Sequence, residues 1–267
     1  MKQISSRDNP AFKRLRGLVE DARARREARA AILDGEHLVR AALDANWPIS
    51  CLVLRDDVLD LPAVREVLQR IRLDIESGKT GVLVMPPGLF NTLSPVTTPT
   101  GILAEIPLPE TLPAPDANGD VLALAGVQDA GNLGTLLRTA VAAGVTQIWL
   151  DRQTTQAWSP KALRAGMGAQ FCLSIAENVD LAQRLASSER RVLVTSLETG
   201  SVSLYALDLR QPSVWVFGSE GQGVPAALQA LAHDRVRIPM PGQIESLNVG
   251  AATAVCLFEQ VRQRLQA

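Results

Sequence analysis

The chain has 267 residues, of which 46% are hydrophobic and 21% charged, and its formal net charge is −1. This composition predicts a globular protein with room for two domains, and no apolar stretch approaches the roughly 20 residues that span a membrane. Three scattered cysteines and two histidines argue against a disulfide framework and a zinc site, and the first residues lack a secretory signal. We therefore expect a cytoplasmic protein with no membrane partner and no metal.

The near-neutral total hides a basic amino-terminal region. Residues 1–30 carry nine Lys and Arg against four Asp and Glu, a net charge of +5, so the rest of the chain carries −6. A local basic segment is the footprint expected for contacts with nucleic-acid phosphates. Charge alone leaves the alternative equally open that these arginines only solvate an exposed helix.

The first part of the chain predicts a small α/β domain. Residues 8–30 indicate a polar, basic helix, and 36–45 a second helix. A helix-like segment at 63–72 lies among apolar runs of strand length. These runs are 51–54, 81–85 and 101–106. The predicted domain covers residues 1–106.

A proline-rich segment follows this domain. Four prolines fall within nine residues, from Pro107 to Pro115, and Asn118-Gly119 comes next. Prolines stiffen such a segment, and it offers little apolar surface to bury. We predict a linker at 107–119 and a second domain at 120–267.

Strand and helix patterns alternate throughout the second domain. The predicted strands are 121–127, 147–150, 191–195, 213–217 and 236–240. The predicted helices are 131–143, 160–167, 225–231 and 247–265. This alternation predicts an α/β fold with a mostly parallel sheet covered by helices on both faces. Ligands of such sheets bind beyond the carboxyl ends of the strands.

The segment 129–138 is the first of three that place glycines and polar residues at such strand ends. Gly131 and Gly134 allow a close approach of the backbone, and the helix start offers unpaired N–H groups to an anion. Arg138 lies about two helical turns past Gly131 and is placed to contact a phosphate or a ribose. By itself the pattern also fits a capped structural loop with a surface arginine.

The second segment, 217–224, spaces its glycines as Gly218, Gly221 and Gly223. This order differs from the dinucleotide-binding G-x-G-x-x-G pattern, and the chain has no P-loop sequence. Glu220 stands among these glycines, where its carboxylate is accessible to a ligand. The alternative role of Glu220 is a carboxylate at the start of the next helix.

The third segment, 238–249, leaves a strand through two prolines and Gly242 and enters the terminal helix. Ser246 fits an N-cap, which is its structural alternative, and small residues at 248–254 allow close packing inside the subunit or across a dimer. A fourth segment, 159–169, places Lys161 and Arg164 on one side of a short helix. A solvated helix face explains this pair equally well.

Together these segments resemble the SpoU class of SPOUT RNA methyltransferases. The likeness covers 120–267 and departs at Gly250, where the family usually has serine. The matching positions are Asn132, Gly134 and Arg138, then Gly218–Gly221, Ile238–Gly242 and Ser246–Val249. Segments 4–10, 34–39 and 99–103 are similar to the L30e-like substrate-binding domain of the same family, and 30–36 matches more loosely.

The resemblance implies an enzyme that transfers a methyl group from S-adenosyl-L-methionine to a ribose 2′-hydroxyl of RNA. Ribosomal RNA is favoured over transfer RNA as the substrate. The resemblance also implies a trefoil knot near the carboxyl end and a homodimer with the active site at its interface. The implied cofactor-binding residues are Thr195, Ser196, Leu197, Gly218, Ile238, Met240 and Leu247.

The resemblance also assigns a central role to Arg138. A guanidinium stays protonated in proteins, so we interpret Arg138 as stabilising the developing alkoxide and the adjacent phosphate rather than as a base. Asn132, Glu220, Ser246 and Asn248 are expected to position the nucleotide and Arg138. The expected RNA contacts are Lys13, Arg14, Arg16, Arg25, Arg26, Lys161 and Arg164.

Two other hypotheses compete with this one. A non-catalytic RNA-binding assembly factor predicts damaged motifs, whereas the motif residues are all present. A methyltransferase of small metabolites has no use for a basic helix or a substrate-binding domain. Base stacking has few candidates, because Tyr205 is the only tyrosine. The other aromatic candidates are Phe12, Phe90, Trp47 and Trp158.

Overall fold

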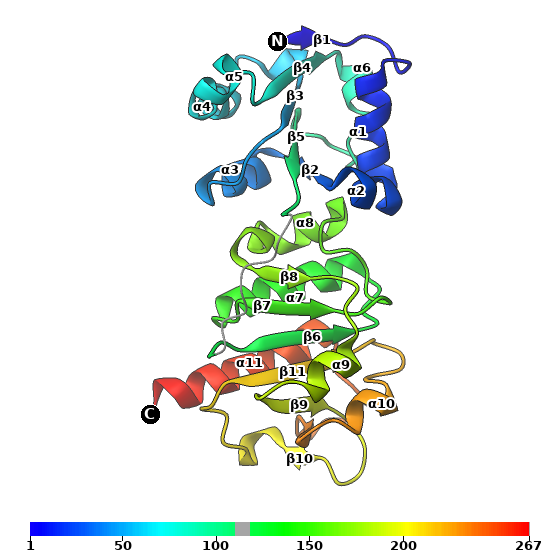
Figure 1. Ribbon diagram of the computed structural model, residues 1–267, viewed down its shortest axis with the longest axis vertical. Helices are drawn as coiled ribbons and strands as arrows, with labels where there is room; N and C mark the ends of the chain where they lie inside the picture. The colour runs from blue at the N-terminus through cyan, green and yellow to red at the C-terminus, as the bar shows by residue number, and fades with distance from the viewer. Residues whose placement is uncertain (110–117, 267) are drawn as a thin grey trace. The chain divides into compact units, whose positions relative to one another are not determined.

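Figure 1 shows the computed structural model, which describes residues 1–109 and 118–266. The chain divides into two compact units. The first comprises Met1–Thr111 and Trp158–Phe171, and the second comprises Leu112–Ala157 and Cys172–Ala267. Residues 110–117 of the predicted linker lie outside the described residues. No helix among the described residues is long and apolar enough to cross a bilayer.

The first unit is built on a five-stranded sheet with the strand order β1-β4-β3-β5-β2. The strands are β1 (Lys2–Gln3), β2 (Ala30–Asp34), β3 (Cys51–Arg55), β4 (Gly81–Met85) and β5 (Ile102–Pro107). β5 runs antiparallel to β2 and β3, and the remaining pairs are parallel. The three strands expected from apolar runs are therefore confirmed, and they lie side by side.

Short helices surround this sheet. They are α1 (Pro10–Glu20), α2 (Ala22–Ala28), α3 (Glu36–Asp44), α4 (Pro62–Arg70), α5 (Arg72–Glu76), α6 (Pro87–Phe90) and α8 (Pro160–Gly166). Phe12, Leu15 and Leu18 recur at intervals of three residues on α1 and are buried against the sheet. This spacing puts one apolar stripe of an otherwise polar helix into the core.

The prediction of one basic helix at 8–30 is wrong in two respects. Asp21 interrupts it with an extended backbone, and its carboxylate accepts a hydrogen bond from Arg23 N at 2.7 Å to cap α2. The last residues of the range belong to β2, which is buried along its whole length. β2 pairs with β5, some 70 residues further along the chain, and no local pattern reveals such a partner.

The second unit contains a seven-stranded sheet with the order β10-β12-β9-β11-β6-β7-β8, and every pair in it is parallel. The strands are β6 (Val121–Ala125), β7 (Gln147–Leu150), β8 (Ser174–Ala176), β9 (Arg191–Thr195), β10 (Val202–Ser203), β11 (Ser213–Gly218) and β12 (Asp234–Arg237). The predicted parallel α/β fold is confirmed. In Figure 1 the arrows of β6 and β7 point to the same edge of the sheet.

Helices cover both faces of this sheet. They are α7 (Ala130–Ala142), α9 (Leu181–Ala186), α10 (Ala226–Gln229) and α11 (Val249–Leu265). Val214 and Val216 of β11 share a core with Leu181 of α9 and Leu228 of α10. Trp215 points to the opposite face, where its Nε1 donates a hydrogen bond to the side-chain oxygen of Gln260 on α11 at 2.7 Å. α7 packs against α11 on that side.

The structure corrects several boundaries in the second unit. α11 begins at Val249 and Asn248 is its N-cap, so Ser246 is not the cap that its sequence position suggested. β12 ends at Arg237, three residues earlier than predicted. The short elements β8, β10 and α9 were not predicted, since two to six residues carry too little periodicity.

Candidate active site

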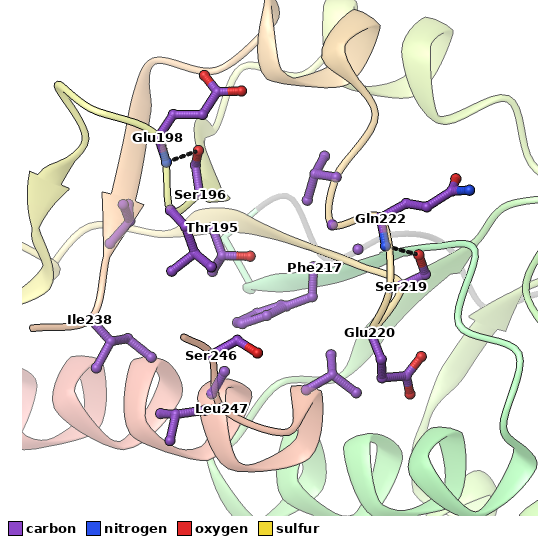
Figure 2. Close-up of a pocket in the computed structure, with 18 of the residues that line it drawn as sticks. Thr195, Ser196, Glu198, Phe217, Ser219, Glu220, Gln222, Ile238, Ser246 and Leu247 are labelled. Carbon is purple, nitrogen blue, oxygen red and sulfur yellow. Dashed lines mark hydrogen bonds between the residues drawn. The ribbon is translucent and has the colours of Figure 1, made fainter. Parts of the chain in front are cut away.

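A cavity of about 630 Å³ lies at the carboxyl ends of β9, β11 and β12 (Figure 2). Three separate segments line it: residues 195–198 after β9, 217–224 at the end of β11, and part of 238–249 between β12 and α11. The predicted convergence at one edge of the sheet is seen for 217–224 and 238–249. The third segment predicted there, 129–138, does not line the cavity, and 195–198 does. The lining combines backbone polar groups with the apolar side chains of Phe217, Ile238, Met240 and Leu247.

The loop after β11 folds back on itself so tightly that only glycine fits at its first position. A Cβ on Gly218 would lie 1.9 Å from the carbonyl carbon of Gly223 and 2.2 Å from the nitrogen of Val224. Ser219 closes the loop, since its carbonyl accepts from Gly223 N at 2.9 Å and its Oγ from Gln222 N at 3.2 Å (Figure 2). This turn presents Glu220 at its tip, exposed and beside the cavity.

Gln229 of α10 connects two of the three lining segments, and the sequence offered no signal for it. Its Nε2 donates to the carbonyl of Val224 at 3.0 Å, and its Oε1 accepts from Ser196 Oγ at 3.3 Å. Ser196 Oγ in turn accepts from Glu198 N at 3.2 Å (Figure 2). The loop after β9 and the loop after β11 are thus held in one arrangement by side-chain hydrogen bonds.

A chain of side-chain amides joins three of the predicted catalytic residues. Asn248 accepts from Gly250 N at 2.9 Å through its Oδ1 and donates its Nδ2 to Asn132 Oδ1 at 3.2 Å. Asn132 then donates its Nδ2 to a carboxylate oxygen of Glu220 at 2.5 Å. Asp129 caps the helix that carries Asn132, at 2.8 Å from its backbone nitrogen. Each amide therefore has a defined orientation, and residues 116 positions apart in the chain are in contact.

The other two predicted catalytic residues lie differently. Ser246 lines the cavity and is exposed. Arg138 is exposed on α7, does not line the cavity, and makes no hydrogen bond or ion pair with any residue that the structure describes. It stands six residues after Asn132, which turns it about 120° around the helix from that side chain. The cavity of one chain therefore does not include Arg138.

All seven predicted cofactor-binding residues line the cavity. They are Thr195, Ser196, Leu197, Gly218, Ile238, Met240 and Leu247. The donor set fits S-adenosylmethionine, because the glycine-rich backbone allows close approach of polar groups and the apolar side chains provide a surface for an aromatic ring. Thr195 uses its own hydroxyl within the sheet, 3.2 Å from the carbonyl of Val216. The described residues contain no group of three or more His, Cys, Asp or Glu side chains placed to hold a metal ion.

Gly250, where the sequence differs from the serine usual in the SpoU pattern, lies where two helices pack closely. A Cβ there would lie 3.1 Å from Asn248 Oδ1 and 3.3 Å from a methyl carbon of Thr135. These distances are tighter than ordinary van der Waals contact, so glycine lets the first turn of α11 approach α7. The glycine thus lies beside Asn248, and its effect is on the packing of α11 against α7.

The expected RNA contacts on the basic helix turn out to be of two kinds. Arg25 is a correction: it is buried, and its guanidinium donates to the carbonyls of Leu18 and Val19 at 2.8 and 3.1 Å, so it satisfies the end of α1. Arg14 pairs with the buried carboxylate of Glu105, which raises the pKa of the arginine. Both side chains are committed to the fold of the first unit.

The remaining basic residues on these helices are exposed. Lys13 lies 3.1 Å from Asp8 and Arg16 lies 2.9 Å from Glu20, and such exposed pairs hold little energy. Arg26 has no side-chain partner among the described residues. These three side chains are free to exchange their present surroundings for a phosphate.

The two basic residues of the fourth segment lie on α8, which belongs to the first unit. Lys161 is exposed. One guanidinium nitrogen of Arg164 is buried and lies 4.0 Å from the buried carboxylate of Asp34, which also accepts from Ser94 Oγ. Burial raises the pKa of Asp34, and Ser94 and Arg164 oppose that rise. Arg164 is thus partly committed to an internal ion pair.

The aromatic candidates for base stacking are mostly core. Phe12 and Phe90 are fully buried. Trp47, Trp158 and Phe171 form one cluster in the first unit, with the Trp47 ring 5.6 Å from Trp158 and 5.4 Å from Phe171. Tyr205 is 59% exposed in the second unit, so it is the candidate that retains a free ring face.

These features define an α/β protein with a cavity at the carboxyl edge of a parallel sheet and a hydrogen-bonded chain of polar side chains beside it. Two family models match the chain: the SpoU rRNA Methylase family over residues 120–258 and the MRM3-like substrate binding domain over residues 2–104. The chain belongs to the SpoU rRNA methylase family. It is therefore a methyltransferase that acts on RNA and uses S-adenosylmethionine, which confirms the predicted family, enzyme class and cofactor.

Full-length relatives support the assignment. The chain is 31% identical to an uncharacterized tRNA/rRNA methyltransferase of Synechocystis, over 99% of this chain and 95% of that protein. It is 30% identical to the 23S rRNA (guanosine(2553)-2′-O)-methyltransferase RlmP of Bacillus subtilis, over 97% and 98% of the two chains. An AdoMet-bound rRNA methyltransferase from Sinorhizobium meliloti matches with a TM-score of 0.84 at 31% identity, over 98% and 97%.

Proposed function

We propose that the protein methylates a ribose 2′-hydroxyl in ribosomal RNA of the large subunit. The observation that carries this proposal is the cavity at the sheet edge with the chain of Asn248, Asn132 and Glu220 beside it. The relatives support the choice of RNA, since RlmP is named for 2′-O-methylation of 23S rRNA. A transfer-RNA substrate is the second candidate, because the Synechocystis relative is named for both RNAs.

The chemistry requires a ribose hydroxyl to lose its proton as it attacks a methyl group. S-adenosylmethionine would supply that methyl group from its sulfonium centre, whose sulfur would leave as a neutral thioether. Glu220 holds a defined position because Asn132 donates to it, so the carboxylate can orient the nucleotide by hydrogen bonding. Ser246 offers a hydroxyl at the cavity wall for the same purpose.

Arg138 has the electrostatic role in this proposal. Its guanidinium stays protonated and stabilises the negative charge that develops on O2′ and on the adjacent phosphate. The proton then leaves to that phosphate or to water. Arg138 lies outside the cavity of its own chain. In a homodimer, Arg138 of one copy would therefore reach the ribose bound at the cavity of the other copy.

A homodimer is accordingly part of the proposal. Arg138 is exposed and without a partner among the described residues, and Phe258 on α11 is 46% exposed, which is high for so large an apolar side chain. The trefoil knot belongs to the same proposal, and it would hold 195–198, 217–224 and 238–249 together around the cofactor.

The exposed Lys13, Arg16 and Arg26 would bind the RNA backbone in the cytoplasm.

The test is transfer of labelled methyl from S-adenosylmethionine to separated, undermethylated ribosomal and transfer RNA, with 2′-O-methyl positions mapped in the product. We expect one labelled ribose in ribosomal RNA. Label in transfer RNA alone would overturn the choice of substrate. No label in either RNA, despite measurable cofactor binding, would favour a non-catalytic assembly factor. Label in a small metabolite but in no RNA would overturn the proposal altogether.

A further inference from the structure

The second unit contains arginines but no lysine, and most of these arginines already have a partner. The paired ones are Arg184 over the ring of Trp149, Arg190 with the carbonyl of Gly119, Arg191 with Asp234, Arg210 with Asp208, Arg235 with Glu198, Arg262 with Glu259 and Arg264 with Asp120. Among the described residues, Arg138, Arg152 and Arg237 have no such contact. A polyanionic substrate is expected to use cations that the fold leaves free.

The three free arginines differ in position. Arg138 already has a role in the proposed function. Arg237 is the last residue of β12 and does not line the cavity, although its neighbours Val236 and Ile238 do. Arg152 stands two residues after the end of β7, at the same carboxyl edge as the cavity, and is exposed.

The turn that carries Arg152 is held rigidly by its neighbours. Asp151 Oδ1 accepts from the backbone nitrogens of Gln153 at 3.2 Å and Thr154 at 2.8 Å, and also from Gly126 N in the loop after β6 at 3.1 Å. Thr154 Oγ1 accepts from Val127 N at 3.2 Å. An arginine on such a fixed turn loses less conformational entropy on binding than one on a mobile loop.

The same turn lies next to the loop that carries Glu220. A Cβ placed on Gly126 would be 3.7 Å from Gln153 Oε1 and 3.7 Å from Ser219 Cβ, so Gly126 lies between the Arg152 turn and the glycine loop. We propose that Arg152 binds a backbone phosphate of the substrate RNA strand beside the nucleotide that is methylated. This inference rests on the proposed function and adds an RNA contact from the catalytic unit itself.

The test compares full-length wild type with R152Q and R152K on undermethylated ribosomal RNA over a range of salt concentrations. We expect R152Q to raise KM for RNA about tenfold with kcat within about twofold, as for loss of one phosphate contact. The slope of log(kcat/KM) against log[salt] should fall by about 0.7 to 0.9. R152K should restore most of the loss, because an ammonium keeps the charge.

Two controls separate this role from a structural one. R210Q removes an exposed arginine of the same unit that Asp208 already neutralises, and it should leave KM and the salt slope unchanged. The Kd of R152Q for S-adenosylmethionine, measured by calorimetry, should equal that of the wild type.

Unchanged KM and salt slope in R152Q, with an active wild type, would overturn this inference alone. A change in the mass of R152Q by light scattering, with an unchanged salt slope, would also overturn it and would place Arg152 against a second copy of the chain. A wild type that methylates no RNA would overturn the proposed function and this inference together.

Discussion

The two units differ in how well the sequence pattern predicted which residues lie together. In the second unit, Asn132, Glu220 and Asn248 come from three distant segments and form one hydrogen-bonded chain beside the cavity. In the first unit, Arg14 and Arg25 were expected to contact RNA, but they bind a buried carboxylate and the end of a helix. The motif segments supplied residues that lie together, with the exception of Arg138, whereas the basic pattern mixed structural arginines with exposed ones.

The physical reason lies in what each pattern requires. The glycine loop has strict steric demands, because a side chain at Gly218 would overlap the backbone of Gly223. An arginine on a helix has no such demand, since its long side chain serves a carbonyl, a carboxylate or a phosphate equally well. Motifs that depend on backbone geometry therefore transfer to structure more reliably than charge patterns do.

The largest effect is expected for G218A. The added Cβ would lie 1.9 Å from backbone carbon, so the loop must move and displace Glu220. We expect cofactor affinity and kcat each to fall on the order of 100-fold, as for a misplaced catalytic group. Calorimetry with S-adenosylmethionine and methyl transfer measure this. G88A, where an added Cβ meets nothing within 4 Å, is the control. Normal binding by G218A would show that the loop is adaptable.

The next effect concerns the amide chain. N132D keeps the shape of the side chain but replaces the donor to Glu220 with a second carboxylate, and the two would repel. We expect kcat to fall about 100-fold with the Kd for S-adenosylmethionine changed less than about threefold. The measurements are kcat for methyl transfer and the Kd for S-adenosylmethionine, compared between the variant and the wild type. A variant with wild-type kcat would contradict a role for Asn132 in holding Glu220.

The first unit provides a matched pair of arginines. R25M leaves the carbonyls of Leu18 and Val19 without their donor, so we expect the free energy of unfolding to fall by about 1 to 3 kcal/mol. R26Q removes an exposed charge and should weaken binding to ribosomal RNA without changing stability. Chemical denaturation and filter binding at fixed salt measure the two effects. Equal loss of stability in both variants would contradict the division between structural and exposed arginines.

The smallest effect is a difference in thiol reactivity. Burial raises the pKa of Cys51 and of Cys256 to about 12, with a further contribution from Glu105 at Cys51. At pH 8 only about one thiol in ten thousand at these sites is a thiolate. Cys172 is exposed. Iodoacetamide at pH 8, followed by mass spectrometry, should therefore modify Cys172 first. Rapid modification of Cys256 would mean that α11 opens readily.

The sequence by itself determined the α/β class, most of the longer strands and helices apart from β2, and two of the segments that line the cavity, 217–224 and 238–249. β7 (Gln147–Leu150) and β9 (Arg191–Thr195) were predicted to the residue, because a buried parallel strand is a continuous apolar run between turn residues. The residues expected to bind the cofactor came from the resemblance to the SpoU family, and all seven line the cavity. Strand geometry alone predicted that 217–224 and 238–249 lie at one edge, because the carboxyl ends of parallel strands meet there.

Only the tertiary structure decided which distant groups share a hydrogen bond. Asp21 interrupts a helix by capping its own backbone, and β2 exists because β5 pairs with it. Gln229 joins two loops, and Arg25 turns inward, since each finds partners that folding brings within about 3 Å. Local periodicity records which face of an element is buried. It does not identify the residue that contacts a given side chain across the interface between two elements. That contact determines whether a polar side chain stabilises the fold or is available to bind substrate.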